Sequence, residues 1–442
     1  MASPLKMMAQ LLCMAAALWM GGLAHATEYT LEQALEAAPS DELSNGVALT
    51  LADALKRAEQ RSEALKAQHS AGLAAQQRAT AAGELPDPML NLEVSNIPAN
   101  GPDQFSLAAD FMTMRGIGLS QTFTRSDKRK AMAGVFQANV DMAQATRQQS
   151  LSELRTATAQ AWFDAFYTKA MLQLLKAQQV ELQLQIDASE ALYRAGKAPQ
   201  ADVFMAKTEL GLLALRIEDT QAAHAVAQSD LQRWVGGTRV DYALAEPVNT
   251  RALSTSEQTL IAEVHRHPEL QMLEQMEAMA KAEAEVKQQE KQADWTLSVM
   301  YAGRGPEFSE MLTLGASRPL FVNPGNRQNA EFAAATAVAE QARSERIERH
   351  RAHLAQTRRW VLNWESNIKR LGDFERSLIP LTQERTRAAM DAYRGATGSL
   401  GDVLAARRME LDMRMEQLRI EMTTAQLWAQ LEFLIPEQEV QP

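Results

Sequence analysis

The side chains most able to bind a metal ion are histidines and methionines at close spacing. They comprise two histidine pairs and one methionine group on a helical face: His265 with His267, His350 with His353, and Met272 with Met276 and Met279. Imidazole suits zinc and related ions, and the methionine thioether suits Cu(I). No third ligand is evident for either histidine pair, and methionine at helical spacing commonly fills a core. Packing or surface roles are therefore favoured over metal contact, and no metal site or cofactor is predicted.

Catalytic motifs are missing from the sequence. It contains no G-x-S-x-G, no H-E-x-x-H and no phosphate-binding Gly-Lys-Ser/Thr loop. An enzyme is not expected, and any energised transport needs its motor in another protein. Without residues 1–26, which hold one lysine, 44 basic residues face 55 acidic ones, a net charge of −11. Nucleic acid is a poor partner for such a charge.

Residues 1–26 have the pattern of a secretory signal peptide. Lys6 precedes the apolar run Leu11–Leu23, and Ala24-His25-Ala26 fits an A-x-A cleavage site. The only cysteine, Cys13, lies inside the apolar run rather than at its end, so a lipoprotein is not expected. No other apolar stretch reaches 18 residues, so no transmembrane helix is predicted.

The remaining chain is an internal duplication. The residues Tyr193-Arg194 and Asp202-Val203 recur as Tyr393-Arg394 and Asp402-Val403, at an offset of 200. At an offset of 198, Ser120–Phe123 aligns with Arg318–Phe321, where Phe123 matches Phe321, and Arg129 and Trp162 match Arg327 and Trp360. Such ordered agreement predicts two repeats of one plan. The expected divisions are an N-terminal extension at 27–49, repeats at 50–236 and 254–436, a linker at 237–253 and a tail at 437–442.

Each repeat predicts an opening helix, two strands, a very long helix and a returning helix. Capping boxes at Thr50-x-x-Asp53 and Ser254-x-x-Glu257 mark the opening helices. These run to about Ala82 and Ala293, the second with a break at His267-Pro268. The long helix at 127–194 has 68 residues, no proline and one glycine, which is roughly 100 Å. Its counterpart at 326–394 contains Pro380, which predicts a kink. The last helix carries a heptad seam, formed by Leu411, Met415, Leu418, Met422, Ala425 and Ala429.

The four predicted strands alternate between apolar and small or polar residues. They lie at about 89–95, 114–123, 295–302 and 311–321, and they form two hairpins. Such alternation is typical of a membrane β-barrel, with lipid outside and water inside, and also of a half-buried soluble sheet. Four strands cannot close a barrel, and lipid does not tolerate unpaired edges. In a membrane, several chains must therefore share one barrel.

The chain resembles the TolC family of outer-membrane efflux proteins over nearly all of its length after the signal. The resemblance rests on the opening Leu51-Ala-Asp-Ala-Leu55-Lys-Arg-Ala58, the paired Tyr-Arg … Asp-Val turns, and the order of hairpin and long helix in both repeats. The segment Ala82–Pro88, followed by Asn96-Ile97-Pro98, most resembles the branch that serves heavy-metal efflux pumps.

This resemblance implies a mainly α fold with a small β part, assembled as a homotrimer. Three chains would share a 12-stranded β-barrel and a periplasmic α-barrel of long coiled-coil-like helices, in the outer membrane of a Gram-negative bacterium. The implied partners are a periplasmic adaptor (membrane fusion) protein, an inner-membrane RND pump and outer-membrane lipid. The implied function is a passive exit duct, with heavy-metal cations as the favoured substrate. Drug efflux, type I secretion and, less favoured, a soluble periplasmic coiled-coil scaffold remain alternatives.

The resemblance places the paired turns at the periplasmic tip. The candidate residues are Tyr193, Arg194, Gly196 and Asp202 in the first repeat, and Tyr393, Arg394 and Asp402 in the second. Asp402 matches the acidic ring of the family's constriction, although Ala405 stands where some relatives have a second acid. A purely structural role in the first turn of the returning helix is the alternative for both aspartates. The two tyrosines could gate the duct or simply fill the turns.

Gly196 has the conformational freedom that a helix-reversing turn needs. In the second repeat the glycine, Gly395, stands one position earlier.

Overall fold

The computed structural model describes residues 48–237 and 242–435. The predicted signal peptide, nearly all of the 27–49 extension and the 437–442 tail lie outside these ranges. The chain divides into two compact units, and every helix and strand named below belongs to the unit of Ala48–Val235 and Arg239–Pro442. This unit is mainly helical with one four-stranded sheet, as predicted. None of the described helices is long and apolar enough to cross a membrane.

The first repeat contains four helices and two strands. They are α3 (Leu51–Arg61), α4 (Glu63–Gly83), β1 (Met89–Ser95), β2 (Met114–Phe123), α5 (Ser126–Arg194) and α6 (Gln200–Val235). Thr50 caps α3 as predicted, because its hydroxyl accepts from the backbone N–H of Asp53 at 3.1 Å. The single opening helix predicted to reach about Ala82 is wrong. Ser62 interrupts it with extended backbone and starts α4 by accepting from the N–H of Leu65 at 3.2 Å.

The second repeat follows the same order with more interruptions. Its elements are α7 (Glu257–Ala262), η2 (Val264–Arg266), α8 (Pro268–Gln289), β3 (Trp295–Gly303), β4 (Met311–Ser317), α9 (Gln328–Asp373), η3 (Phe374–Leu378), α10 (Ile379–Arg394) and α11 (Leu400–Glu432). The break before Pro268 is present as predicted.

Three boundaries of the second repeat differ from expectation. The cap of its first helix is Ser256 rather than Ser254, and Ser256 accepts from the N–H of Thr259 at 3.2 Å. The helix α8 ends at Gln289, before the expected Ala293. The strand β4 ends at Ser317 rather than near residue 321, and Pro319, just beyond it, has no N–H to donate to a ladder.

The two long helices differ in continuity. The helix α5 runs for 69 residues without interruption. Its counterpart is divided into α9 and α10 by the π-helical turn η3, which ends at Leu378, and Pro380 lies in the first turn of α10. Proline lacks the N–H that the regular ladder requires, and a π turn is one way in which a helix absorbs such a defect. A π turn therefore lies where the kink was predicted.

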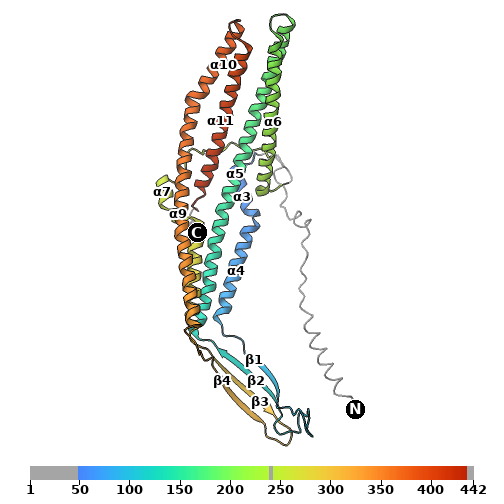
Figure 1. Cartoon of the computed structure of the whole chain (residues 1–442), viewed down its shortest axis with the longest axis vertical. Helices are drawn as coiled ribbons and strands as arrows, with labels where there is room; N and C mark the ends of the chain where they lie inside the picture. Colours follow the sequence, from blue (N-terminus) through green and yellow to red (C-terminus); the bar gives the residue numbers. More distant parts are fainter. Residues whose placement is uncertain (1–47, 238–241, 436–442) are drawn as a thin grey trace, which may run out of the picture. The chain divides into compact units, whose positions relative to one another are not determined.

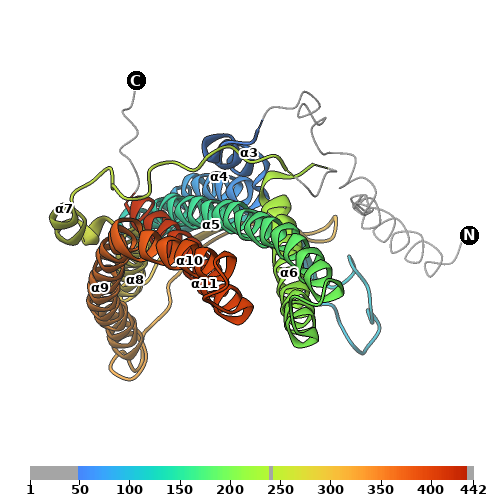
Figure 2. The same ribbon diagram turned by 90° about the horizontal axis from the view of Figure 1, so that it is seen from above.

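Most helices of the unit pack lengthwise around α5. The helices α4, α6, α8 and α11 lie along α5, whereas α9 packs on α8 and α11, and α10 on α11 (Figures 1 and 2). Most of the predicted seam of α11 is buried in this packing, namely Leu411, Met415, Ala425 and Ala429.

One tryptophan from each long helix donates a hydrogen bond to the backbone just before its own repeat begins. The indole N–H of Trp162 donates to the carbonyl of Leu49 at 3.1 Å, and that of Trp364 donates to the carbonyl of Thr250 at 3.0 Å.

The sheet lies at the opposite end of the unit from the α5–α6 and α10–α11 turns (Figure 1). Its strand order is β1-β2-β3-β4, and all neighbours are antiparallel. The two predicted hairpins are thus joined side by side through β2 and β3. An acidic residue fixes the junction with the helices: Asp294 accepts from the backbone N–H of Arg125 at 3.1 Å and from Lys128 Nζ at 2.8 Å.

Candidate functional site

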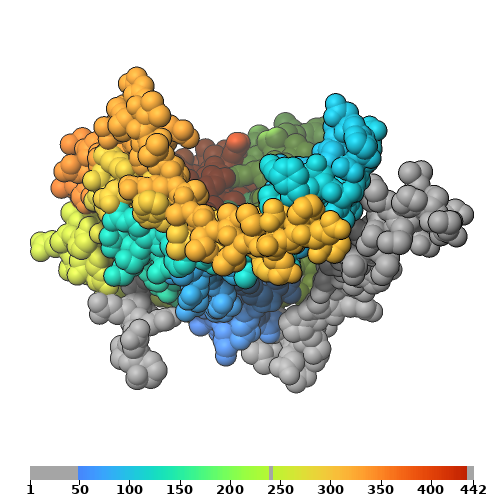
Figure 3. All heavy atoms as spheres, turned by 90° about the horizontal axis from the view of Figure 1, so that it is seen from below, coloured from blue at the N-terminus to red at the C-terminus, as the bar shows by residue number. Residues whose placement is uncertain are grey.

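The strand register aligns apolar residues in rows that cross the whole sheet. Residues directly opposite one another in antiparallel strands share a face. Two rows take one residue from each strand: Leu92, Ile117, Tyr301 and Leu312 form one, and Leu90, Leu119, Val299 and Leu314 form the other. All eight side chains are exposed, up to 76% for Leu314. In the space-filling view from the sheet end, the yellow and orange atoms of β3 and β4 lie in front with no helix over them (Figure 3).

The opposite face of the sheet carries mostly small and polar residues, together with Met89, Met300 and Met311. Its central row consists of Asn91, Gly118, Met300 and Thr313. A side chain at Gly118 has no room, because a Cβ would lie 2.7 Å from the carbonyl oxygen of Val299. Polar side chains form hydrogen bonds between strands on this face. Asn91 Nδ2, for example, donates to Ser120 Oγ at 3.0 Å. The sheet therefore has one apolar and one polar face, as the alternation predicted.

Aromatic residues flank the apolar rows at both ends. Phe123 pairs with Trp295 at the helical end. At the loop end the rings of Phe111 and Phe308 lie 6.4 Å apart. Aromatic girdles of this kind are characteristic of strands at membrane–water interfaces.

Both outer strands of the sheet have a partner on one side only. Among the described residues β1 pairs with β2 alone, and β4 pairs with β3 alone. The outer edges of β1 and β4 thus present backbone N–H and C=O groups that another strand could pair.

The two helix-reversing turns share one backbone motif, with different residues at its critical position. In the first turn Gly196 has a φ of +69°, and the N–H of Lys197 donates to the carbonyl of Leu192 at 2.9 Å. In the second turn Ala396 has a φ of +57°, and Thr397 donates to Ala392 at 2.9 Å. Both are Schellman caps. The shift of the glycine to position 395 therefore leaves an alanine in the left-handed conformation.

Asp402 is part of a capping box at the start of α11. Its Oδ2 accepts from the hydroxyl of Ser399 at 2.7 Å and from the backbone N–H of Ser399 at 3.2 Å. In return the N–H of Asp402 donates to Ser399 Oγ at 3.1 Å. These bonds from Ser399 hold the pKa of the Asp402 carboxyl below its usual value. Asp402 thus has the helix-capping role that was the structural alternative in the sequence analysis. Its carboxylate is nevertheless exposed.

Only some of the candidate tip residues come together. Partial burial, and then the charge of Asp202, raise the pKa of Tyr393. The start of α11 lies beside α6, because a Cβ added to Gly401 would be 3.5 Å from the sulfur of Met205. Tyr193 is 44% exposed. Arg194 binds Glu190 on its own helix at 2.9 Å, and Arg394 faces Asp391 at 3.9 Å.

The histidine pairs of the sequence are rearranged by the fold. The structure joins His267 of one pair to His353 of the other, with Glu269 beside both. Glu269 and His353 are 84 residues apart, so no local spacing could have revealed the cluster. The three methionines of α8 are half-buried.

No protein-family model matches the chain, and no curated protein matches it by sequence. Solved structures do match it. CusC, whose structures concern transmembrane channel formation, has a TM-score of 0.73 at 15% identity and covers 87% of this chain and 92% of its own. The outer-membrane protein VceC of Vibrio cholerae has a TM-score of 0.71 at 16% identity, covering 87% and 95%. The outer-membrane channel OprN has a TM-score of 0.71 at 16% identity, covering 87% and 89%.

The chain has the fold of these outer-membrane channels. The resemblance to TolC-family channels is thereby confirmed for the fold. The three similarities are nearly equal, so they do not separate a heavy-metal branch from the others.

Proposed function

We propose that this chain is one protomer of a trimeric, passive exit duct in the outer membrane of a Gram-negative bacterium. In this proposal it is the outer-membrane component of a tripartite efflux pump. A periplasmic adaptor protein and an inner-membrane RND pump supply the other two components. The duct itself performs no chemistry.

The observation that carries the proposal is the exposed pair of apolar rows on a sheet with two open edges. Exposed apolar rows this regular are costly in water, whereas lipid accepts them. Lipid does not accept the unpaired backbone of β1 and β4. Both requirements are met if β4 of one chain pairs with β1 of the next. Three four-stranded sheets then close one barrel.

The helical part supports the periplasmic half of the proposal. A helix of 69 residues spans roughly 100 Å, which is far more than a membrane core requires. Twelve long helices from three chains would continue the barrel as a tunnel, with the Schellman turns at its far end. Those turns are the expected contact with the adaptor.

The favoured substrate is a heavy-metal cation. Support comes from the segment Ala82–Pro88, which resembles the heavy-metal branch, and from the exposed carboxylate of Asp402 at the tip. Drug efflux and type I secretion through the same fold remain the alternatives.

A pair of neighbouring substitutions in β4 tests the duct. Leu314 and Thr313 are adjacent and both exposed in the isolated chain, but they point to opposite faces. Leu314→Arg places a charge toward lipid, which destabilises a barrel by about 2–4 kcal/mol near the bilayer centre. It should therefore sharply reduce the amount of crosslinked trimer in outer-membrane fractions. Thr313→Arg faces the lumen and should assemble like the parent. Equal assembly of the two variants, or a soluble periplasmic monomer for the parent chain, would refute the proposal.

A further inference from the structure

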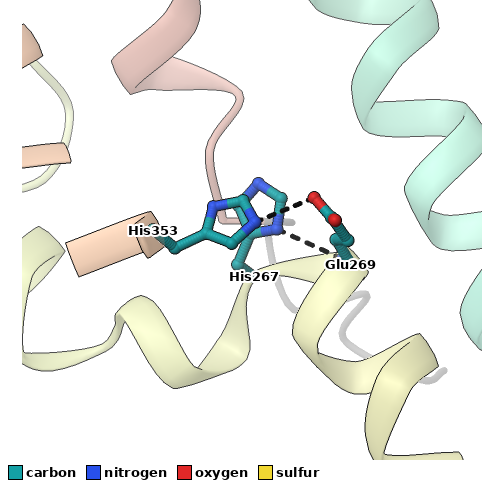
Figure 4. Close-up of side chains that lie close together, drawn as sticks. All are labelled: His267, Glu269 and His353. Atoms are coloured by element: carbon teal, nitrogen blue, oxygen red, sulfur yellow. Dashed lines mark hydrogen bonds and ion pairs between the residues drawn. The ribbon is translucent and has the colours of Figure 1, made fainter. Parts of the chain in front are cut away.

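Three metal-ligating side chains meet where α8 begins against α9. His267 is the N-cap of α8, Glu269 lies in its first turn, and His353 comes from α9 (Figure 4). One potential ligand atom from each lies within 4.8 Å of the other two. The imidazole rings are 4.1 Å apart between centroids, at an angle of 36°. The cluster lies outside the strands and turns to which a function was assigned above.

The side chain of His267 is oriented by a hydrogen bond at the start of α8. Its Nδ1 accepts from the backbone N–H of Glu269 at 3.1 Å, and a nitrogen that accepts carries no proton. A nitrogen without a proton has a lone pair that can ligate a metal ion.

The two oxygens of Glu269 have separate partners. Oε2 lies 2.8 Å from His353 Nε2, and Oε1 accepts from Arg349 Nε. Arg349 therefore orients the carboxylate through one oxygen and leaves the other directed at the histidine. Orientation of a ligand by a neighbouring hydrogen bond is usual around protein metal sites.

We propose that His267, Glu269 and His353 bind a divalent transition-metal ion of the zinc class. Two imidazoles and one carboxylate are a donor set found in zinc sites. The ion would enter between His353 Nε2 and Glu269 Oε2, in place of the proton that these atoms share. It would link the start of α8, at the break before Pro268, to α9. The proposal does not depend on the exit-duct function.

Two features set the expected strength of binding. His267 must give up its capping hydrogen bond, since the nitrogen that ligates the ion cannot also accept from Glu269. The positive charge of Arg349 also opposes a cation. Binding should therefore be weaker than in a site without these competitors. Access is available, because the side chains of His353 and Glu269 are 12% and 18% exposed, and a cavity of about 270 Å³ borders His267.

The test is a titration of the purified mature chain, without a polyhistidine tag, with Co²⁺. Visible absorption reports imidazole coordination, and Zn²⁺ is added as competitor. We expect one ion per chain. His353→Gln and Glu269→Gln should each weaken binding more than about tenfold, since loss of even an orienting partner of a ligand costs 10–100-fold. His350→Gln is the matched control, three residues away on α9, and should bind like the parent.

A thermal melt with and without Zn²⁺ separates binding from folding. The parent and His350→Gln should melt at a higher temperature with Zn²⁺, whereas folded His353→Gln should not. The proposal is overturned if the parent binds no Co²⁺, if His353→Gln and Glu269→Gln bind as the parent does, or if His350→Gln loses as much affinity as His353→Gln.

Discussion

The two repeats build the same elements with different degrees of regularity. The first has an unbroken α5 and a glycine at the left-handed position of its turn. The second has a π turn, and an alanine at that position. Both opening helices are interrupted, by Ser62 in the first repeat and ahead of Pro268 in the second. The first repeat is thus the regular member, and most departures from ideal helix geometry lie in the second.

The two repeats also differ in how tightly Trp162 and Trp364 are packed. Trp162 is fully buried and stacks on Phe166 with ring centroids 5.6 Å apart. Trp364 makes the equivalent hydrogen bond but is only half-buried, at the edge of a cluster around Val361. The two tryptophans therefore make equivalent hydrogen bonds to the backbone but bury unequal amounts of apolar surface.

The largest expected effect is that of the first-repeat tryptophan. Trp162→Ala should lower the free energy of unfolding by about 3–5 kcal/mol, because it removes a fully buried aromatic side chain and leaves a cavity. Trp364→Ala should cost clearly less, since part of that side chain is already in water. Denaturant unfolding of the purified variants measures both. Equal decreases in the free energy of unfolding would contradict the expected difference between Trp162 and Trp364.

The turn residues give an intermediate effect. Gly196→Ala should destabilise by about 1–2 kcal/mol, because a side chain in the left-handed region strains the backbone. A new Cβ there meets nothing within 4 Å, so the cost is conformational. Ala396→Gly should stabilise by roughly 0.5 kcal/mol, the relief of strain being partly offset by the entropy of glycine in the unfolded chain. Denaturant unfolding again measures both changes.

Gly134 provides the control for the turn variants. It lies within α5, and a Cβ added to it would likewise meet nothing within 4 Å. Gly134→Ala should therefore stabilise, since alanine is the better helix former by about 1 kcal/mol. A loss of stability at Gly134 as large as that at Gly196 would contradict the backbone explanation.

The smallest expected effect concerns the aspartates at the starts of the returning helices. Asp402→Asn removes the charge and keeps an acceptor for Ser399. In a trimer it should lower the cation-over-anion permeability ratio, because a unit charge about 4 Å away in water stabilises a cation by about 1 kcal/mol and destabilises an anion by a similar amount. Asp202→Asn should do less, since Asp202 is half-buried near Tyr393. Single-channel reversal potentials measure the ratio, and unchanged selectivity in Asp402→Asn would refute the acidic ring.

Local patterns in the sequence determined the kinds of element and their order. A period of two identified the strands, since side chains on a strand alternate between faces. The absence of proline identified the uninterrupted helix. Gly196 identified a left-handed position, because glycine adopts it without strain. Each of these features depends on a residue and its near neighbours along the chain, which is why it was readable.

Features that depend on distant residues were decided only by the tertiary structure. The register between β2 and β3 completes the apolar rows, and it joins strands separated by two long helices. The meeting of His267 with His353 depends on how α8 packs against α9. Packing and hydrogen bonding between elements set these outcomes, and no spacing along the chain encodes them.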